Sequence, residues 1–286
     1  EPIEIHIDID KDKIGQVILF IDGEEVDWFN SPVYDYTWET ASLTLGEHTY
    51  AIDINDMNGD DIIVKTLTIT IIDSNAPTAP ATVTDIDGNV YHTVVIGTQV
   101  WMVENLKTTR YRNGDAIPQV SGQEAWETRT TDAYCNMNND VAIGDVYGRL
   151  YNFYAVEHAS KICPEGWHVP TRDELKTLAD YLGGMSIAGK KMKEAGATHW
   201  TYYNDPVNNG TNESGFTALG AGTRNTGGFF DTFGGTCAFW TSEGYSYNEK
   251  RYGYRRGLGI ESSEFSDYSG TLANIGHSVR CLMDEQ

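Results

Sequence analysis

The chain has 286 residues, of which 40% are hydrophobic and 12% aromatic, and its formal net charge at pH 7 is −22. This apolar content is enough for packed cores, which excludes intrinsic disorder, and the length predicts two domains. A surface this acidic repels phosphate backbones and anionic lipid headgroups, so no nucleic-acid partner is expected. No window holds the roughly 18 apolar residues of a membrane span. The chain begins at Glu1 with neither a methionine nor a signal peptide, as expected of a mature or trimmed chain.

Residues 1–75 carry the pattern of a small β-sandwich. Between positions 3 and 9, isoleucine alternates with polar residues, which predicts a half-buried strand. Asp22-Gly23 and Asn58-Gly59 each predict a hairpin turn between further strands. Tyr50 follows a glycine-containing corner, as the tyrosine corner of immunoglobulin-like domains does. We therefore expect an all-β, immunoglobulin-like sandwich that carries seventeen acidic and three basic side chains.

The turn around Asn58 also provides candidate metal ligands. Asp56, Asn58 and Asp60 place side-chain oxygens at the alternate positions of a calcium-binding loop. Position 67 is Leu67, so the glutamate that would complete an EF-hand loop is missing. An ordinary hairpin turn is the favoured interpretation, with calcium as the alternative, and no other cofactor is expected.

The second domain is predicted over residues 82–286, after a linker of proline and small residues at 76–81. Its clearest element is a helix after Thr171, which forms a capping box with Glu174. Leucines recur at helical spacing until Gly183-Gly184 ends the pattern. Further predicted elements are a helix over 187–194, a long loop over 204–236, and strands over 238–242, 251–258 and 277–282.

The four cysteines bear on the compartment of the protein. Their even number permits two disulfides in three connectivities. No CxxC pair occurs, and no histidine spacing completes a zinc site. A secreted or periplasmic setting is therefore favoured over the cytosol.

Six segments of the second domain occur in the order that is typical of one family. They are residues 83–91 (VTDIDGNVY), 96–106 (IGTQVWMVENL), 148–154 (GRLYNFY), 163–170 (CPEGWHVP), 212–216 (NESGF) and 278–281 (SVRC). In these segments the chain resembles the FISUMP domain, the Fibrobacter succinogenes major paralogous domain, which is common in surface proteins of Bacteroidetes and Fibrobacteres. The resemblance covers roughly residues 82–284.

The resemblance implies an α+β, C-type-lectin-like fold and a place on the cell surface. It implies that Cys163 pairs with Cys281, which leaves Cys135 with Cys237, and that both pairs are structural. Trp101, Tyr151 and Trp167 lie within the family motifs and are expected in the core. Such domains often follow immunoglobulin-like modules in lipoproteins, so we expect a cell-surface or secreted protein, most readily an outer-membrane lipoprotein. Its contact with the membrane would then be limited to a lipid anchor outside this sequence. The family has no established general activity, so the resemblance implies none.

Catalytic motifs are absent from the sequence. There is no GxSxG, no HExxH and no phosphate loop, and the motifs through which lectins chelate calcium and sugar together are missing. Cys237 and Cys281 lack the neighbours expected of a formylglycine-generating-enzyme-like pair. Carboxylates for glycoside hydrolysis need no local motif, so a glycan-processing enzyme stays an alternative. A protein without catalytic activity is favoured.

An aromatic cluster before the last cysteine is the predicted ligand-binding site. Its members are Trp240, Tyr245, Tyr247, Tyr252, Tyr254 and Tyr268, with Arg255, Arg256 and Asp267 among them. Tyrosine and tryptophan give stacking area at low entropic cost, although aromatic residues are also favoured in ordinary strands. The predicted function is recognition or adhesion, with an extracellular glycan or protein bound through these C-terminal loops. An enzyme that uses the same face and a structural or pilus-tip subunit are the alternatives.

Overall fold

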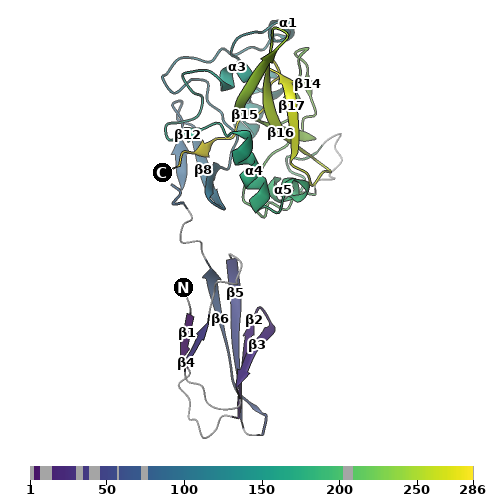
Figure 1. Cartoon of the computed structure of the whole chain (residues 1–286). Coiled ribbons are helices and arrows are strands. Elements are labelled where there is room, and N and C mark those ends of the chain that lie inside the picture. The colour runs from purple at the N-terminus through teal and green to yellow at the C-terminus, as the bar shows by residue number, and fades with distance from the viewer. Residues whose placement is uncertain are drawn as a thin grey trace. The chain divides into compact units, whose positions relative to one another are not determined.

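The computed structural model describes residues 3–6, 15–29, 35–38, 46–56, 58–71, 77–201 and 209–285 (Figure 1). The chain divides into two compact units, residues 1–76 and 77–286. In the predicted linker, Ala79 packs on the core of the second unit, and the Thr93 amide donates to the carbonyl of Ala81 at 3.2 Å. The end of the linker is therefore attached to the second unit. No helix in the described ranges is long and apolar enough to cross a membrane.

In the first unit, four strands form an antiparallel sheet in the order β3-β2-β5-β6, and β1 pairs separately with β4. The strands are β1 (Ile3–His6), β2 (Gln16–Ile21), β3 (Glu24–Phe29), β4 (Asp35–Trp38), β5 (Gly46–Asn55) and β6 (Asp61–Ile71). Asp22 and Gly23, with φ of 51° and 85°, form the tight turn between β2 and β3, which confirms the first predicted hairpin. Val17 and Ile54 are paired across the sheet and buried. Of the strand predicted at positions 3–9, only the part up to His6 lies within the described residues.

The second unit combines a five-stranded sheet in the order β12-β18-β9-β8-β7, a three-stranded sheet in the order β15-β16-β17, and short helices. Its strands are β7 (Thr82–Thr84), β8 (Val90–Ile96), β9 (Gln99–Met102), β10 (Tyr134–Cys135), β11 (Leu150–Tyr151), β12 (Trp167–His168), β13 (Thr223–Arg224), β14 (Phe230–Asp231), β15 (Thr236–Tyr247), β16 (Lys250–Gly259), β17 (Ser266–Leu272) and β18 (Leu282–Met283). Its helices are α1 (Gln123–Glu127), α2 (Val141–Tyr147), α3 (Phe153–Val156), α4 (Arg172–Tyr181) and α5 (Met185–Met192), with a 3-10 turn, η3, at Met137–Asn139. Helices α4 and α5 lie beside the three-stranded sheet (Figure 1).

Helix α4 begins where the capping box predicts. The Glu174 amide donates to Thr171 Oγ1 at 3.2 Å, and the Thr171 amide donates back to the Glu174 carboxylate at 2.7 Å. The helix ends at Tyr181, before two glycines with φ near 100°. Helix α5 starts and ends earlier than predicted. It ends at Met192 because Lys193 has an extended backbone conformation, which carries the Lys193 side chain into the core.

The prediction of a strand over 277–282 is wrong for most of its length. This segment passes between several elements, so its backbone pairs with each of them only briefly. His277 bridges to Tyr151, Ser278 bridges to Phe239, and only at Leu282 does a strand pairing begin. The other two predicted strands form the middle of the longer strands β15 and β16.

Buried cations organise the loop-rich part of the second unit. Arg280 lies between the rings of Phe216 and Phe239 and donates to Asn105 and to the carbonyl of Met102. Lys193 donates to four oxygens, three of them backbone carbonyls between positions 259 and 262. A buried cation is tolerated only when such acceptors replace its water. These side chains therefore hold loops in place where sheet pairing is sparse.

One of the two disulfides implied by the family resemblance is present and the other is absent. Cys163 and Cys281 are joined, across a sequence separation of 118. Cys135 and Cys237 are free, buried thiols, so the expected second pair is wrong. They belong to different apolar clusters, since Cys135 packs with Trp126 and Leu150 around β10 and β11, and Cys237 packs with residues of β15 and β16. Burial raises the pKa of Cys135 to about 12 and that of Cys237 to about 11, which keeps both thiols protonated.

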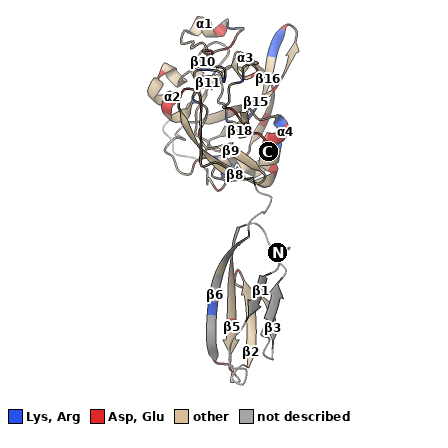
Figure 2. Cartoon of the chain, turned by 90° about the vertical axis from the view of Figure 1, so that its left-hand side faces the viewer, with Lys and Arg blue, Asp and Glu red and all other residues tan. Residues whose placement is uncertain are grey.

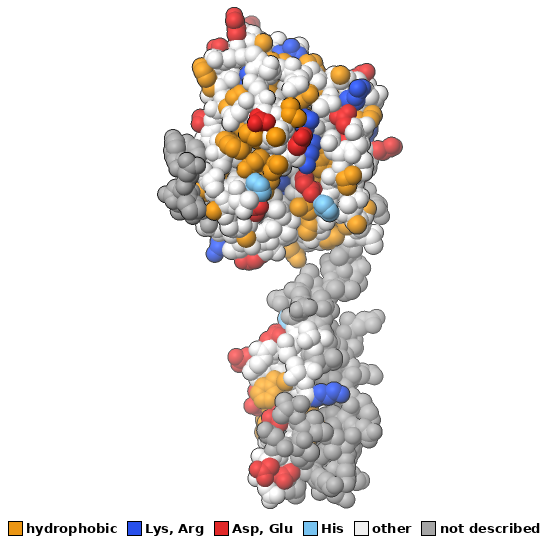
Figure 3. All heavy atoms as spheres, turned by 180° about the vertical axis from the view of Figure 1, so that it is seen from behind, with side chains coloured by type: hydrophobic (Ala, Val, Ile, Leu, Met, Phe, Trp, Pro, Cys, Tyr) orange, Lys and Arg blue, Asp and Glu red, His pale blue; other side chains and the backbone are white. Residues whose placement is uncertain are grey.

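The back of the second unit exposes hydrophobic, acidic and basic side chains next to one another (Figure 3). Figure 3 shows hydrophobic side chains in the middle of this view, among carboxylates and basic groups. Figure 2 places α2 on the side of the unit away from β15 and β16, and its residues Val141 and Val146 are exposed. The three-stranded sheet is thus not the only place where the second unit exposes apolar side chains.

Candidate functional site

At its hairpin end the three-stranded sheet packs one face on the core and directs the other outward, whereas farther along β15 both faces are buried, as the fully covered Phe239 and Trp240 show. Gly244 and Gly253 are paired across β15 and β16, and a Cβ at either position would lie 2.4 Å from the Phe153 ring. The sheet therefore approaches α3 closely on its inner face because these two positions lack side chains. Neighbouring positions on each strand point the opposite way.

Three tyrosines form a ladder of rings on the outer face. Tyr245 on β15 stacks on Tyr252 of β16, with ring centroids 5.1 Å apart and an interplanar angle of 10°. Tyr254 follows at 5.4 Å from Tyr245, tilted by 41°. Here Tyr245, Tyr252 and Tyr254 are called the tyrosine ladder. All three tyrosines are half-buried, and the Tyr245 hydroxyl lies over Gly270 of β17.

Helix α4 closes one end of the ladder. The Arg172 guanidinium carbon lies 4.3 Å from the centroid of Tyr254, and Arg172 Nη2 lies 3.0 Å from the Asp267 carboxylate on β17. The Arg172 amide donates to Glu243, which lies in an irregular part of β15 between Trp240 and Gly244. The first residue of α4 is thereby fixed to both edge strands of the sheet.

The other end of the ladder is open. Tyr247 is separated from Tyr245 by one residue on β15, so strand alternation directs it to the same face. It is the most exposed of the large hydrophobic residues in the described ranges, at 64%. The strand then turns at Asn248 and Glu249, whose φ values of 46° and 61° are those of a tight hairpin. Tyr247 is consequently the member of the predicted cluster whose ring is best placed to stack on a ligand.

Trp240 does not contribute to a binding surface, so this part of the prediction is wrong. Its side chain is 0% exposed. The ring packs on Phe153 and His277, and Nε1 donates to the carbonyl of Tyr151 at 2.8 Å. Trp240 precedes Tyr245 by five residues, so strand alternation places the two side chains on opposite faces. The irregular part of β15 does not change this, because Trp240 and Gly244 are paired with Arg255 and Gly253, which share one face of β16.

The remaining predicted residues are divided between the two faces. Arg255 and Tyr268 are paired in register, with the guanidinium 4.1 Å from the ring centroid, on the face opposite to the ladder. Arg256 is only 4% exposed, 3.5 Å from Asp267, so it supports that carboxylate and is inaccessible to a ligand. Asp267 is exposed and stands beside the ladder. The structure therefore brings together four of the tyrosines and Asp267.

A polar cleft lies near the free end of the β15–β16 hairpin and was missed by sequence analysis. Its volume is about 480 Å³, and its lining contains Tyr154, Arg129, Asn274 and Lys250. Figure 2 shows basic residues at that end of the hairpin. Acidic and basic groups both line the cleft, which suits hydrogen bonding to a neutral polar ligand. Its residues come from segments far apart in the chain, so no local motif indicates it.

The predicted calcium ligands form a turn among themselves. The Asp56 carboxylate accepts the amide hydrogens of Asn58 at 2.7 Å and Asp60 at 3.0 Å. The bond from the Asp60 amide, followed by that from Asn58, lowers the pKa of Asp56 below its usual value. No group of three or more His, Cys, Asp or Glu side chains in the described ranges is placed to hold a metal ion. The hairpin turn, the favoured interpretation, is what the structure shows.

The core and cap residues of the family motifs lie where they were expected. Trp101, Tyr151 and Trp167 are buried. His168 lies between two carboxylates, with Nε2 at 2.9 Å from Glu174 and Nδ1 at 2.6 Å from Asp284. The hydrogen bond to Glu174 is the main cause of a raised His168 pKa. This histidine connects the start of α4 to the end of the chain.

These features define a class: a disulfide-closed, predominantly β domain with an outward-facing aromatic sheet. The model of the Fibrobacter succinogenes major domain matches residues 94–283, which is more than half of the chain, and the chain belongs to this family. No curated protein matches the chain. Among solved structures, the fibronectin(III)-like modules of Clostridium thermocellum CbhA are similar at 21% identity, over 25% of this chain and 77% of that chain, with a TM-score of 0.21. A similarity at that TM-score carries no argument here.

Proposed function

We propose that this protein is a recognition module of the bacterial cell surface that binds extracellular glycan without transforming it. In this proposal an immunoglobulin-like first unit carries a C-type-lectin-like second unit. Membership in the Fibrobacter succinogenes major domain family and the predominantly β architecture support a cell-surface module. The disulfide between Cys163 and Cys281 supports an oxidising compartment, as a secreted protein or outer-membrane lipoprotein would meet.

The observation that carries the proposal is the open end of the tyrosine ladder. Pyranose rings present an apolar face of C–H groups and a rim of hydroxyls. The exposed ring of Tyr247 offers a stacking surface for the C–H face of a sugar. The hydroxyls of the tyrosine ladder offer hydrogen bonds to the sugar hydroxyls. The polar cleft lies on the inner side of the hairpin, where Arg251 covers the Phe153 ring, so it would offer a second polar surface separate from the ladder.

The charge of the protein favours a neutral glycan. A chain with a net charge of −22 repels uronates and sulfated sugars at a distance. In the cleft, Arg251 is already paired with Glu157 at 2.6 Å, so it does not offer an uncompensated positive charge to an anionic sugar. Because no candidate metal cluster occurs in the described ranges, we expect binding without calcium.

An array of neutral and acidic glycans, screened with and without EDTA, tests the proposal. We expect saturable binding of a neutral glycan, unchanged by EDTA, and at least about fivefold weaker binding by Tyr247→Ala, since stacking of this kind is worth about 1–3 kcal/mol. Tyr181→Ala is the matched control, because Tyr181 is an exposed tyrosine on α4. Equal loss in both variants, exclusive binding to protein ligands, or cleavage of the bound glycan would each contradict the proposal.

A further inference from the structure

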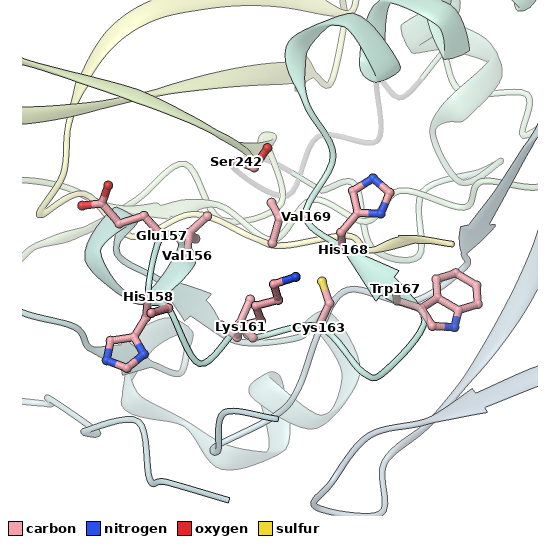
Figure 4. A pocket seen from close by; sticks show the side chains of 11 residues that line it. Val156, Glu157, His158, Lys161, Cys163, Trp167, His168, Val169 and Ser242 are labelled. Carbon is pink, nitrogen blue, oxygen red and sulfur yellow. The ribbon is translucent and has the colours of Figure 1, made fainter. Parts of the chain in front are cut away.

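A second, apolar cavity lies beside the disulfide and does not belong to the proposed glycan site. Its volume is about 340 Å³, at the lower end of the range for small-molecule sites. Val156, Ile162, Val169 and Cys163 line it, with Ser242 of β15 at one side. Figure 4 shows Lys161 and Cys163 directed into the middle of the cavity, with Val169 facing them. One cationic side chain thus enters a mostly apolar space.

Lys161 is an exposed residue and, in the part of the chain that the structure describes, the one lining group whose charge is not paired with another side chain. Within the described ranges, its ammonium forms no ion pair and no side-chain hydrogen bond. Its backbone is in the left-handed region at φ 54°, which a non-glycine residue adopts at some cost. The Lys161 carbonyl accepts the amide of Arg112 at 3.0 Å, and the Lys161 amide donates to His158, so the strained residue is held from both sides.

The other charged groups around the cavity are already paired. The Glu157 carboxylate binds Arg251 through two nitrogens, at 2.9 and 2.6 Å. Both ring nitrogens of His168 contact carboxylates outside the cavity. The His158 ring stacks on Tyr111, with centroids 4.1 Å apart. None of these groups is free to neutralise Lys161.

We infer that this cavity binds a small organic acid, with an apolar body against Val156, Ile162 and Val169 and a carboxylate on the Lys161 ammonium. The volume fits one aromatic ring or branched alkyl group with a short acid tail. The apolar contacts supply affinity through burial, and the charge-assisted hydrogen bond fixes the orientation of the ligand. A free small acid and the carboxyl end of a peptide share this chemistry. The inference is independent of glycan binding.

Calorimetric titration of the whole chain with 3-phenylpropanoate tests the site, with 3-phenylpropan-1-ol as the uncharged partner ligand. The acid is expected to saturate and to bind at least about tenfold more tightly than the alcohol, which corresponds to about 1.4 kcal/mol. Lys161→Met keeps an apolar stem and removes the charge, so the acid should bind this variant no better than the alcohol does. Lys176→Met on α4, at an exposed lysine outside the cavity lining, should bind both ligands as the wild type does.

A second variant keeps the test decisive if Lys161→Met folds poorly. Ala159 is an exposed lining residue, and Ala159→Trp would fill the mouth of the cavity and abolish binding of both ligands. Equal affinity for acid and alcohol, full acid binding by either cavity variant, or no saturable binding of the acid would overturn the inference. The tripeptide Gly-Gly-Phe and its amide distinguish the source: tighter binding of the free peptide than of 3-phenylpropanoate assigns the site to a polypeptide end, and the reverse assigns it to a small acid.

Discussion

Arg172 and Asp267 form an ion pair at 3.0 Å between the first residue of α4 and the edge strand β17. The same guanidinium covers Tyr254 at 4.3 Å, so this contact fixes the closed end of the tyrosine ladder. Tyr247 lies at the opposite, open end. This asymmetry leaves the open end and the outer edge of the ladder for the approach of a ligand.

Removing the contacts of Arg172 at the closed end of the ladder should lower stability only slightly. Arg172→Met loses the ion pair and the contact with Tyr254, but both charged side chains are more than a third exposed. Solvent screening therefore limits the cost to about 1 kcal/mol in the free energy of unfolding, measured with urea. Lys176→Met, which breaks the exposed pair with Asp180, is the control and should cost about 0.5 kcal/mol or less. A loss above about 3 kcal/mol in Arg172→Met would mean that the pair is a core contact.

The close approach of the sheet to α3 predicts a marked difference between two glycine substitutions. Gly253→Ala would place a methyl group 2.4 Å from the Phe153 ring, and such overpacking costs about 1–3 kcal/mol. Gly259→Ala on the same strand meets its nearest atom at 3.6 Å and should be nearly neutral. Urea unfolding of both variants checks this. Gly253→Ala should cost less free energy of unfolding in a Phe153→Leu background than in the wild type, because the smaller side chain leaves room for the methyl group. An equal cost in both backgrounds would show that the two residues are not in contact.

His168 should make stability depend on pH in a defined direction. Its pKa is raised in the folded protein, first by the hydrogen bond to Glu174 and also by that to Asp284. A raised folded pKa means that this stabilisation is complete below the unfolded value near 6.5 and is lost as pH rises through the folded value. Burial opposes ionisation of Glu174, but the bonds from His168 and Thr171 lower its pKa to about 2, so its contribution is lost only as pH falls from about 4.5 toward 2.

The measurement is urea unfolding of the wild type and of His168→Gln at pH 5.5 and pH 8.5. We expect the wild type to exceed the variant by more at pH 5.5 than at pH 8.5. A His92→Gln variant, at an exposed histidine that contacts Glu104, controls for a general histidine effect. An equal difference at the two pH values would show that the carboxylates do not hold the His168 proton.

The disulfide-bonded cysteines should contribute to stability, and the two free cysteines should be unreactive in the folded protein. Removing the disulfide with Cys163→Ala and Cys281→Ala should cost about 2–5 kcal/mol, because it closes a long loop in the unfolded chain. Cys135 and Cys237 should react with an alkylating reagent only after unfolding, since both are buried and protonated. Urea unfolding of the double variant checks the first statement, and peptide mapping without reduction, after alkylation with and without urea, checks the second. A peptide that links Cys135 to Cys237 would contradict the structure.

Local signals in the sequence predicted the local structure well. The capping box at Thr171 and Glu174 and the Asp22-Gly23 turn depend on neighbouring residues alone, and both are present. The pairing of Cys163 with Cys281 came from the resemblance to the FISUMP domain, and residue spacing alone left it open. The immunoglobulin-like and C-type-lectin-like assignments of the two units stay predictions.

The composition of the candidate site was harder to predict. Proximity in sequence grouped Trp240 with the tyrosines, although strict alternation along β15 places Trp240 on the inner face. The failure of the Cys135–Cys237 pair has a different cause, because nothing local reports that two buried cysteines occupy separate clusters. The cavity around Lys161 also depends on long-range packing, which brings Ser242 beside the segment 156–169.

Glycan binding on the tyrosine ladder is tested most directly by an NMR titration of the protein, labelled at its tyrosine rings, with the best neutral glycan from the array. We expect saturable shifts in the ring signals of Tyr245, Tyr247, Tyr252 and Tyr254, while the buried Tyr91 and Tyr111 are unchanged. Saturable glycan binding that leaves those four ring signals in place would show that the outer face of the β15–β16–β17 sheet is not the binding site.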